Sequence, residues 1–81
     1  MIDRVGATVS NNDVVLAAAK TFVATGVAKD NKIYFYESET GKIKTANPSF
    51  FDFYIMLPKT HCEETAHKVK RIKEFLEENN L

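Results

Sequence analysis

Residues Ile33–Ala46 read IYFYESETGKIKTA, and this segment predicts a β-hairpin at the centre of the protein. Its first part, Ile33–Glu37, is rich in aromatic and β-branched residues, which favour strands. Its last part, Lys42–Ala46, alternates polar and apolar residues, as a returning strand does. The residues between them, Ser38–Gly41, are typical of a tight turn that ends with a glycine in the left-handed conformation.

The hairpin register follows from the length of its loop. A three-residue loop, Glu39–Gly41, places Tyr36 opposite Lys44 and Tyr34 opposite Ala46. This register separates apolar from polar side chains most cleanly, and that separation normally fixes strand register. A loop longer by one residue would place the lysines beside Phe35, which is a poorer arrangement, so we predict the shorter loop.

In this register the two faces of the hairpin differ in chemistry. One face carries Ile33, Phe35 and Ile43, and we expect it to form the core. The opposite face carries two tyrosines and two lysines: Tyr34, Tyr36, Lys42 and Lys44. We expect this second face to remain uncovered, because two helices cover only one face of so small a sheet.

The segment before the hairpin predicts a strand and then a helix. Alternation of small apolar and polar residues indicates a short edge strand over Val5–Val9. Residues Ser10–Asp13 offer several N-cap side chains, and Gly26 is a natural helix stop. We therefore expect a helix to about Thr25, with an apolar stripe that contains Val15, Ala18, Ala19 and Phe22.

The segment after the hairpin predicts a third element and a final helix. Phe50–Leu57 fits a strand, or a helix capped by Asn47 with Pro48 at its first position; its aromatic content and short length favour the strand. As a strand, it directs Phe51, Phe53, Ile55 and Leu57 toward the core. Thr60 and Glu63 have the capping-box spacing, and the following helix should reach about Glu78. Its buried stripe is Cys62, Ala66, Val69, Ile72 and Leu76.

The predicted fold is therefore a single α+β domain over residues 1–81. Its elements follow the order β-α-β-β-β-α, as a small antiparallel sheet with two helices packed on one face. A chain of 81 residues is near the lower limit for a self-sufficient core, and association between copies is a common remedy.

Charge and cysteine content restrict the function and the compartment. Eleven Lys and Arg balance eleven Asp and Glu, whereas proteins that grip phosphate backbones are usually basic. The single cysteine, Cys62, allows no internal disulfide, which fits the cytoplasm. The first residues do not resemble a signal peptide, and no apolar run approaches the roughly 20 residues of a membrane span. We expect a cytoplasmic protein without membrane association.

The sequence offers no catalytic or metal-binding constellation. Cys62 and His67 are five residues apart on a predicted helix and point in different directions, so they do not converge on a metal ion. Cys62 lies on the buried stripe, beside Glu63 and Glu64, which oppose a reactive thiolate. We therefore expect no enzymatic activity, no metal and no cofactor.

The uncovered aromatic face suggests a binding function. An exposed aromatic surface of several hundred Å² usually marks an interaction site. We expect a small regulatory or inhibitory module that binds another protein, and itself as a homo-oligomer, through this face. On the last helix, Phe75 lies off the buried stripe, either packed on a neighbouring element or exposed to a partner, with Lys68 and Arg71 beside it. The predicted binding residues are Tyr34, Tyr36, Lys42, Lys44, Tyr54, Lys68, Arg71 and Phe75.

The alternative is a nucleic-acid or nucleotide binder that uses the same tyrosines and lysines. Aromatic rings stack on single-stranded bases, and nearby lysines contact phosphates. The basic run His67–Lys73 spreads around its helix and is typical of a solvated face. Because the net charge is balanced, we place this alternative second.

Overall fold

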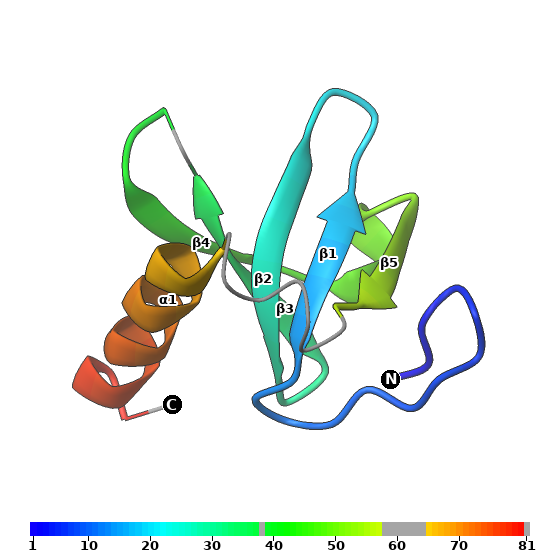
Figure 1. Ribbon diagram of the computed structural model, residues 1–81, viewed down its shortest axis with the longest axis horizontal. Helices are drawn as coiled ribbons and strands as arrows, with labels where there is room; N and C mark the ends of the chain where they lie inside the picture. The colour runs from blue at the N-terminus through cyan, green and yellow to red at the C-terminus, as the bar shows by residue number, and fades with distance from the viewer. Residues whose placement is uncertain (38, 58–64, 81) are drawn as a thin grey trace.

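The computed structural model describes residues 1–37, 39–57 and 65–80. Five strands form one antiparallel sheet, and a single α-helix follows them (Figure 1). The elements are β1 (Val14–Ala18), β2 (Val23–Lys29), β3 (Lys32–Glu37), β4 (Lys42–Ala46), a 3₁₀ turn (Pro48–Phe50), β5 (Phe53–Met56) and α1 (Ala66–Glu78). The strands lie in the order β4-β3-β2-β1-β5, so β4 and β5 are the two edges. The α+β class is confirmed.

The prediction of two helices on one face is wrong, because only α1 is found in the described part of the chain. The segment expected to be a helix forms the hairpin β1–β2 instead. Most of β2 is buried on both faces, so its residues lack the alternation that normally reveals a strand. The polar residues expected to cap the helix form a turn, in which Asn12 has a positive φ and the Asp13 carboxylate accepts a hydrogen bond from Ser10 N.

Gly26 was predicted to end a helix, and it lies in the middle of β2. A Cβ at this position would lie 2.7 Å from Ile33 Cγ2 and 3.0 Å from the backbone oxygen of Tyr34. The neighbouring strand β3 therefore approaches too closely for any side chain. Close packing, and not helix termination, explains this glycine.

The N-terminal residues form a turn at the sheet edge, and the edge strand expected over Val5–Val9 is not formed. A single bridge joins Ile2 and Thr8. Arg4 N donates to Tyr54 O at 2.9 Å, so the turn is attached to β5. Figure 1 shows this N-terminal segment near β5, on the opposite side of the sheet from α1.

The hairpin β3–β4 is confirmed in place, but its predicted register is wrong by one residue. The observed partners are Phe35 with Lys44 and Tyr36 with Ile43, which leaves a four-residue loop. Gly41 has the expected left-handed conformation, with φ of 70°. Lys44 tolerates its place beside Phe35 because β4 is an edge strand, where a long side chain keeps its ammonium in solvent.

In the 50–57 segment the favoured strand interpretation is confirmed, and the helix interpretation is wrong beyond the one turn that precedes the strand. Pro48–Phe50 forms one 3₁₀ turn with Asn47 as its N-cap, and Phe53–Met56 forms β5. The predicted facing is wrong for much of this strand. Tyr54 pairs with the buried Ala17, whereas Phe53 is 36% exposed.

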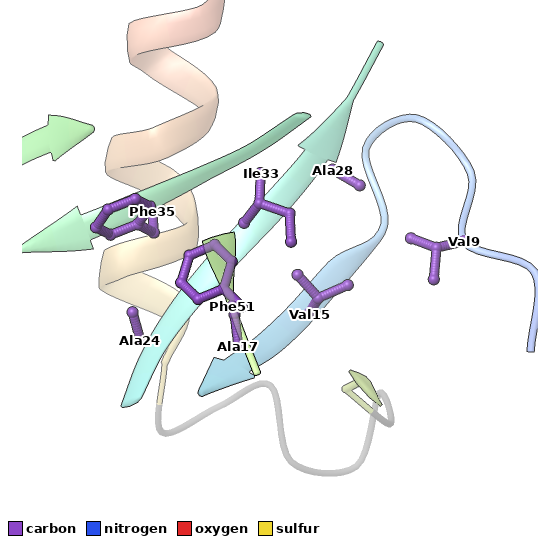
Figure 2. Packing of buried hydrophobic residues seen from close by; sticks show 8 residues of the cluster. All are labelled: Val9, Val15, Ala17, Ala24, Ala28, Ile33, Phe35 and Phe51. Atoms are coloured by element: carbon purple, nitrogen blue, oxygen red, sulfur yellow. The ribbon is translucent and has the colours of Figure 1, made fainter. Parts of the chain in front are cut away.

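Two apolar clusters lie on opposite faces of the sheet. The helix-side cluster is Val27, Tyr34, Ile72 and Leu76, bordered by Tyr36, Ile43, Val69 and Phe75. The loop-side cluster is Val9, Val15, Ala17, Ala24, Ala28, Ile33, Phe35 and Phe51 (Figure 2). The first forms because α1 packs on β2, β3 and β4, and the second because two non-regular segments contribute Val9 and Phe51.

The buried stripe predicted for the last helix is confirmed at Ile72 and Leu76, with Val69 partly buried. The predicted cap, Thr60 and Glu63, and the first stripe residue, Cys62, lie outside the described residues. Ala66, the second stripe residue, begins the helix and is exposed. In residues 1–37, 39–57 and 65–80, no helix is long and apolar enough to cross a membrane.

Candidate functional site

The predicted tyrosine and lysine face is divided between the two sides of the sheet. Tyr34 is 8% exposed and lies under α1, with its ring centroid 6.4 Å from that of Phe75. Tyr36 is half-buried on the same side, and its ring meets the His67 ring edge-on at 6.2 Å. Lys44 lies on the opposite side, beside Phe35. The register error causes this division, because a shift of one residue moves every side chain of a strand to the other face.

The remaining predicted residues also separate. Tyr54 lies on β5 and donates a hydrogen bond to Ile2 O at 2.7 Å. Lys68 is half-buried on α1. Phe75 packs on a neighbouring strand, as one of the two interpretations required, and it stays partly exposed.

Three of the predicted residues come together in a cleft between β4 and α1. Lys42 lies on the β4 side, and Arg71 and Phe75 lie on the α1 side. The cleft has a volume of about 440 Å³, and Gly41, Ile43, Glu74 and Glu78 complete its lining. It therefore combines an apolar floor with charges of both signs.

Lys42 and Lys44 share one acidic neighbour, Glu37. Lys44 forms an ion pair with the Glu37 carboxylate, and Lys42 is its partner across the strands. The Lys44 ammonium, which donates to the carboxylate, holds the pKa of Glu37 below its ordinary value, and Thr40 adds a second hydrogen bond. The two lysines therefore stand beside one carboxylate across the strands, and a second carboxylate, Glu39, lies in the loop that joins them.

The exposed aromatic surface is made of phenylalanines that are not among the predicted binding residues. We define the phenylalanine surface as Phe22, Phe35, Phe50 and Phe51. Phe22, at the tip of the β1–β2 hairpin, lies 5.9 Å from Phe35 and 6.4 Å from both Phe50 and Phe51, between ring centroids. Phe35 and Phe51 are buried, whereas Phe22 is 39% and Phe50 is 57% exposed.

The two exposed rings of this surface are supported by the two buried rings, so they form one continuous aromatic surface. Phe51 meets Phe35 edge-on at 5.6 Å and Phe50 edge-on at 5.2 Å, so all four rings form a connected set. Figure 2 shows Phe35 and Phe51 within the loop-side cluster. Phe22 contacts both of these rings, and Phe50 contacts Phe51. A hollow of about 480 Å³ adjoins it, lined by Phe22, Phe35, Tyr36 and the acidic Glu37 and Glu39, among others. Aromatic residues flanking a turn were the available signal, but Phe22 was assigned to a helix.

Within the described residues, no group of three or more His, Cys, Asp or Glu side chains is arranged to hold a metal ion. The cysteine, His61 and Glu63 of the sequence lie outside those residues.

Comparisons of the chain with models of protein families, with curated proteins and with solved structures find no match.

Proposed function

We propose that this protein is a small non-enzymatic interaction module that associates with a second copy of itself through the phenylalanine surface. The observation that carries the proposal is the partly exposed pair Phe22 and Phe50, which rests on two buried rings. Aromatic side chains in such settings supply much of the binding energy of protein interfaces. A regulatory or inhibitory role would use this surface for a partner protein.

Charge favours a second copy as the occupant. A two-fold interface brings the same patch of both copies together, so it must be self-complementary. Carboxylates of Glu37 and Glu39 border the hollow beside Phe22, and Lys44 lies on the same face next to Phe35. Within one copy Lys44 is already paired with Glu37, so across a two-fold axis each copy can bring this lysine to Glu39 of the other while the phenylalanines meet.

The measurement is the mass in solution, by sedimentation equilibrium over a wide concentration range. We expect a reversible dimer that Phe22→Ser and Phe50→Ser weaken by about 30-fold or more each, the ratio that corresponds to about 2 kcal/mol. Val5→Ser is the matched control, because Val5 is 77% exposed and lies in the N-terminal turn, outside the phenylalanine surface. A protein that stays monomeric at the highest concentration contradicts the proposal, as does a dimer that neither serine variant weakens.

Nucleic-acid binding by the tyrosines and lysines has less support. Stacking on Tyr34 would require α1 to leave the sheet, and the lysines do not share a face with the tyrosines. Salt separates the two functions: association through buried phenylalanines should persist at high salt, whereas phosphate binding should fall steeply. Anisotropy of a labelled single-stranded oligonucleotide measures the second directly.

A further inference from the structure

The two edge strands of the sheet differ in whether other residues hydrogen-bond to their outer backbone groups. At β5, the N-terminal turn occupies the outer backbone groups, since Arg4 N donates to Tyr54 O and Met56 N donates to Asp3 Oδ2, both at 2.9 Å. At β4, the ladder with β3 is the sole strand pairing among the described residues. An edge strand of this kind is a template for a further strand.

The turn between β2 and β3 identifies the backbone groups that β4 leaves free. Asp30 and Asn31 both have positive φ values, 49° and 62°, as in a two-residue hairpin turn closed by the pair Lys29 and Lys32. That closing pair exchanges both hydrogen bonds, and bonding alternates along a strand. Tyr34 and Tyr36 therefore bond to β2.

The alternate residues of β3, which include Phe35, consequently bond to β4. Their partners in β4 are Lys42, Lys44 and Ala46. The backbone N–H and C=O groups of the two intervening residues, Ile43 and Thr45, point away from the sheet. A strand added to this edge would pair with these two residues.

Side chains on the two faces of β4 offer different chemistry to such a strand. On one face lie Lys42 and Lys44, both exposed. On the other face lies the half-buried Ile43, which borders the cleft with Phe75. One face of the edge therefore carries two lysines beside Glu37, and the other carries Ile43 and the exposed Thr45, next to a cleft with charges of both signs.

We infer that β4 binds an extended peptide in which acidic and apolar residues alternate. Peptides add to exposed sheet edges through main-chain hydrogen bonds, and alternate side chains supply the specificity. The acidic residues would face Lys42 and Lys44, where Glu37 neutralises only part of the charge. The apolar residues would enter the cleft over Ile43 and Phe75. A peptide of the same pattern with lysines would be repelled.

The probe is the acetylated and amidated heptapeptide Glu-Val-Glu-Val-Glu-Val-Glu, titrated into the ¹⁵N-labelled full chain. We expect saturable shifts that are largest at the backbone amides of Ile43 and Thr45. Two control peptides test the pattern: one replaces every glutamate by lysine, and one groups the same residues so that alternation is lost. Equal binding of either control overturns the inference, as does a set of shifts that leaves the β4 amides unmoved.

Two variants test the backbone and the charges separately. Thr45→Pro removes the outward N–H, which an edge strand tolerates when the N–H faces solvent, whereas Thr45→Val keeps it. We expect the proline variant alone to lose binding. The double variant Lys42→Glu with Lys44→Glu should weaken binding of the acidic peptide about tenfold or more and bind the lysine peptide instead. Unchanged preference in this double variant overturns the inference even if the proline variant does not fold.

The inference is independent of self-association through the phenylalanine surface. Phe22→Ser and Phe50→Ser leave the β4 edge intact, so both variants should bind the peptide as the parent chain does. If dimerisation is absent and peptide binding persists, only the proposed function fails. If dimerisation is present and the peptide does not bind, only the inference fails.

Discussion

At the scale of single residues, Asp3 holds the N-terminal turn together and attaches it to the sheet. Its Oδ1 accepts hydrogen bonds from Val5 N at 3.1 Å and Ala7 N at 2.8 Å. Its Oδ2 accepts from Met56 N of β5. Backbone donors, Met56 first, hold the pKa of this carboxylate below its ordinary value although burial opposes them. One side chain thus closes a turn and satisfies the backbone of an edge strand.

We predict that Asp3→Asn destabilises the protein at neutral pH by several degrees in Tm. The side-chain amide of this variant keeps one oxygen, which can accept the hydrogen bonds of the turn. Its NH2 group replaces the oxygen that accepts from Met56 N–H, so two donors would face each other. Because the folded pKa is lowered, the carboxylate stabilises the fold above the unfolded pKa, and this contribution is lost as pH falls through the folded pKa. The difference between the two proteins should therefore shrink below about pH 4.

Thermal unfolding midpoints of both proteins across this pH range test the prediction, with the exposed Asp52 changed to Asn as the control. A difference that is constant with pH would show that the Asp3 charge is not responsible.

Gly26 is the second residue whose identity the packing dictates. We predict that Gly26→Ala costs about 1–3 kcal/mol, because the new methyl overlaps Ile33 Cγ2. The measurement is the free energy of unfolding in urea, placed in a double-mutant cycle with Ile33→Ala, which removes that methyl group. The alanine should cost less in the Ile33→Ala background. If Gly26→Ala lowers the free energy of unfolding equally in both backgrounds, the methyl group of Ile33 is not the cause, and β2 and β3 instead move apart to accommodate the new Cβ.

At the scale of elements, the sequence predicts β3, β4 and α1 because each carries a strong local signal, and it favours a strand at β5 because the segment is aromatic and short. Glycine fixes the β3–β4 turn, and the spacing of Val69, Ile72 and Leu76 identifies the inward side of α1. By contrast, β1 and β2 carry short apolar runs, for which helix and strand cannot be separated by periodicity. Their strand structure depends on neighbours on both sides, and that information is not local.

The candidate site could be predicted only in part, for the same reason. The register error of one residue placed Ile43 on the wrong face of the hairpin. Separately, the face of Tyr34 and Tyr36, which was expected to remain uncovered, is the one on which α1 docks. Lys42, Arg71 and Phe75, all predicted as binding residues, line one cleft. Phe22 was missed because its exposure beside Phe50 depends on where two loops meet.

The docking of α1 gives a prediction at this scale. Ile72 is fully buried against β2 and β3, so Ile72→Ala should destabilise the protein by about 2–5 kcal/mol. Lys73→Ala, one position along and exposed, should change the stability by less than about 0.5 kcal/mol. Urea denaturation followed by far-UV circular dichroism measures both. A small effect of Ile72→Ala would indicate that α1 contributes little to the fold.

At the scale of the whole molecule, the sheet separates two hydrophobic clusters, and no side chain belongs to both. Ile33 belongs to the loop-side cluster and Ile72 to the helix-side cluster, and both are fully buried. Neither cluster is large, yet β2 and β3 contribute residues to both. Loss of packing on one face should therefore loosen strands that the other face needs, and this makes the two clusters one cooperative unit.

We predict that Ile33→Val and Ile72→Val each cost about 0.5–1.5 kcal/mol, and that their costs add within about 0.5 kcal/mol in the double variant. Additivity is expected because the two side chains lie in separate clusters, while cooperativity is expected because the strands are shared. Unfolding in urea should consequently show one transition, with coincident curves from far-UV circular dichroism and from tyrosine fluorescence. Two separated transitions would mean that α1 leaves the sheet before the sheet unfolds, and Tyr34 would then be available to solvent in the intermediate.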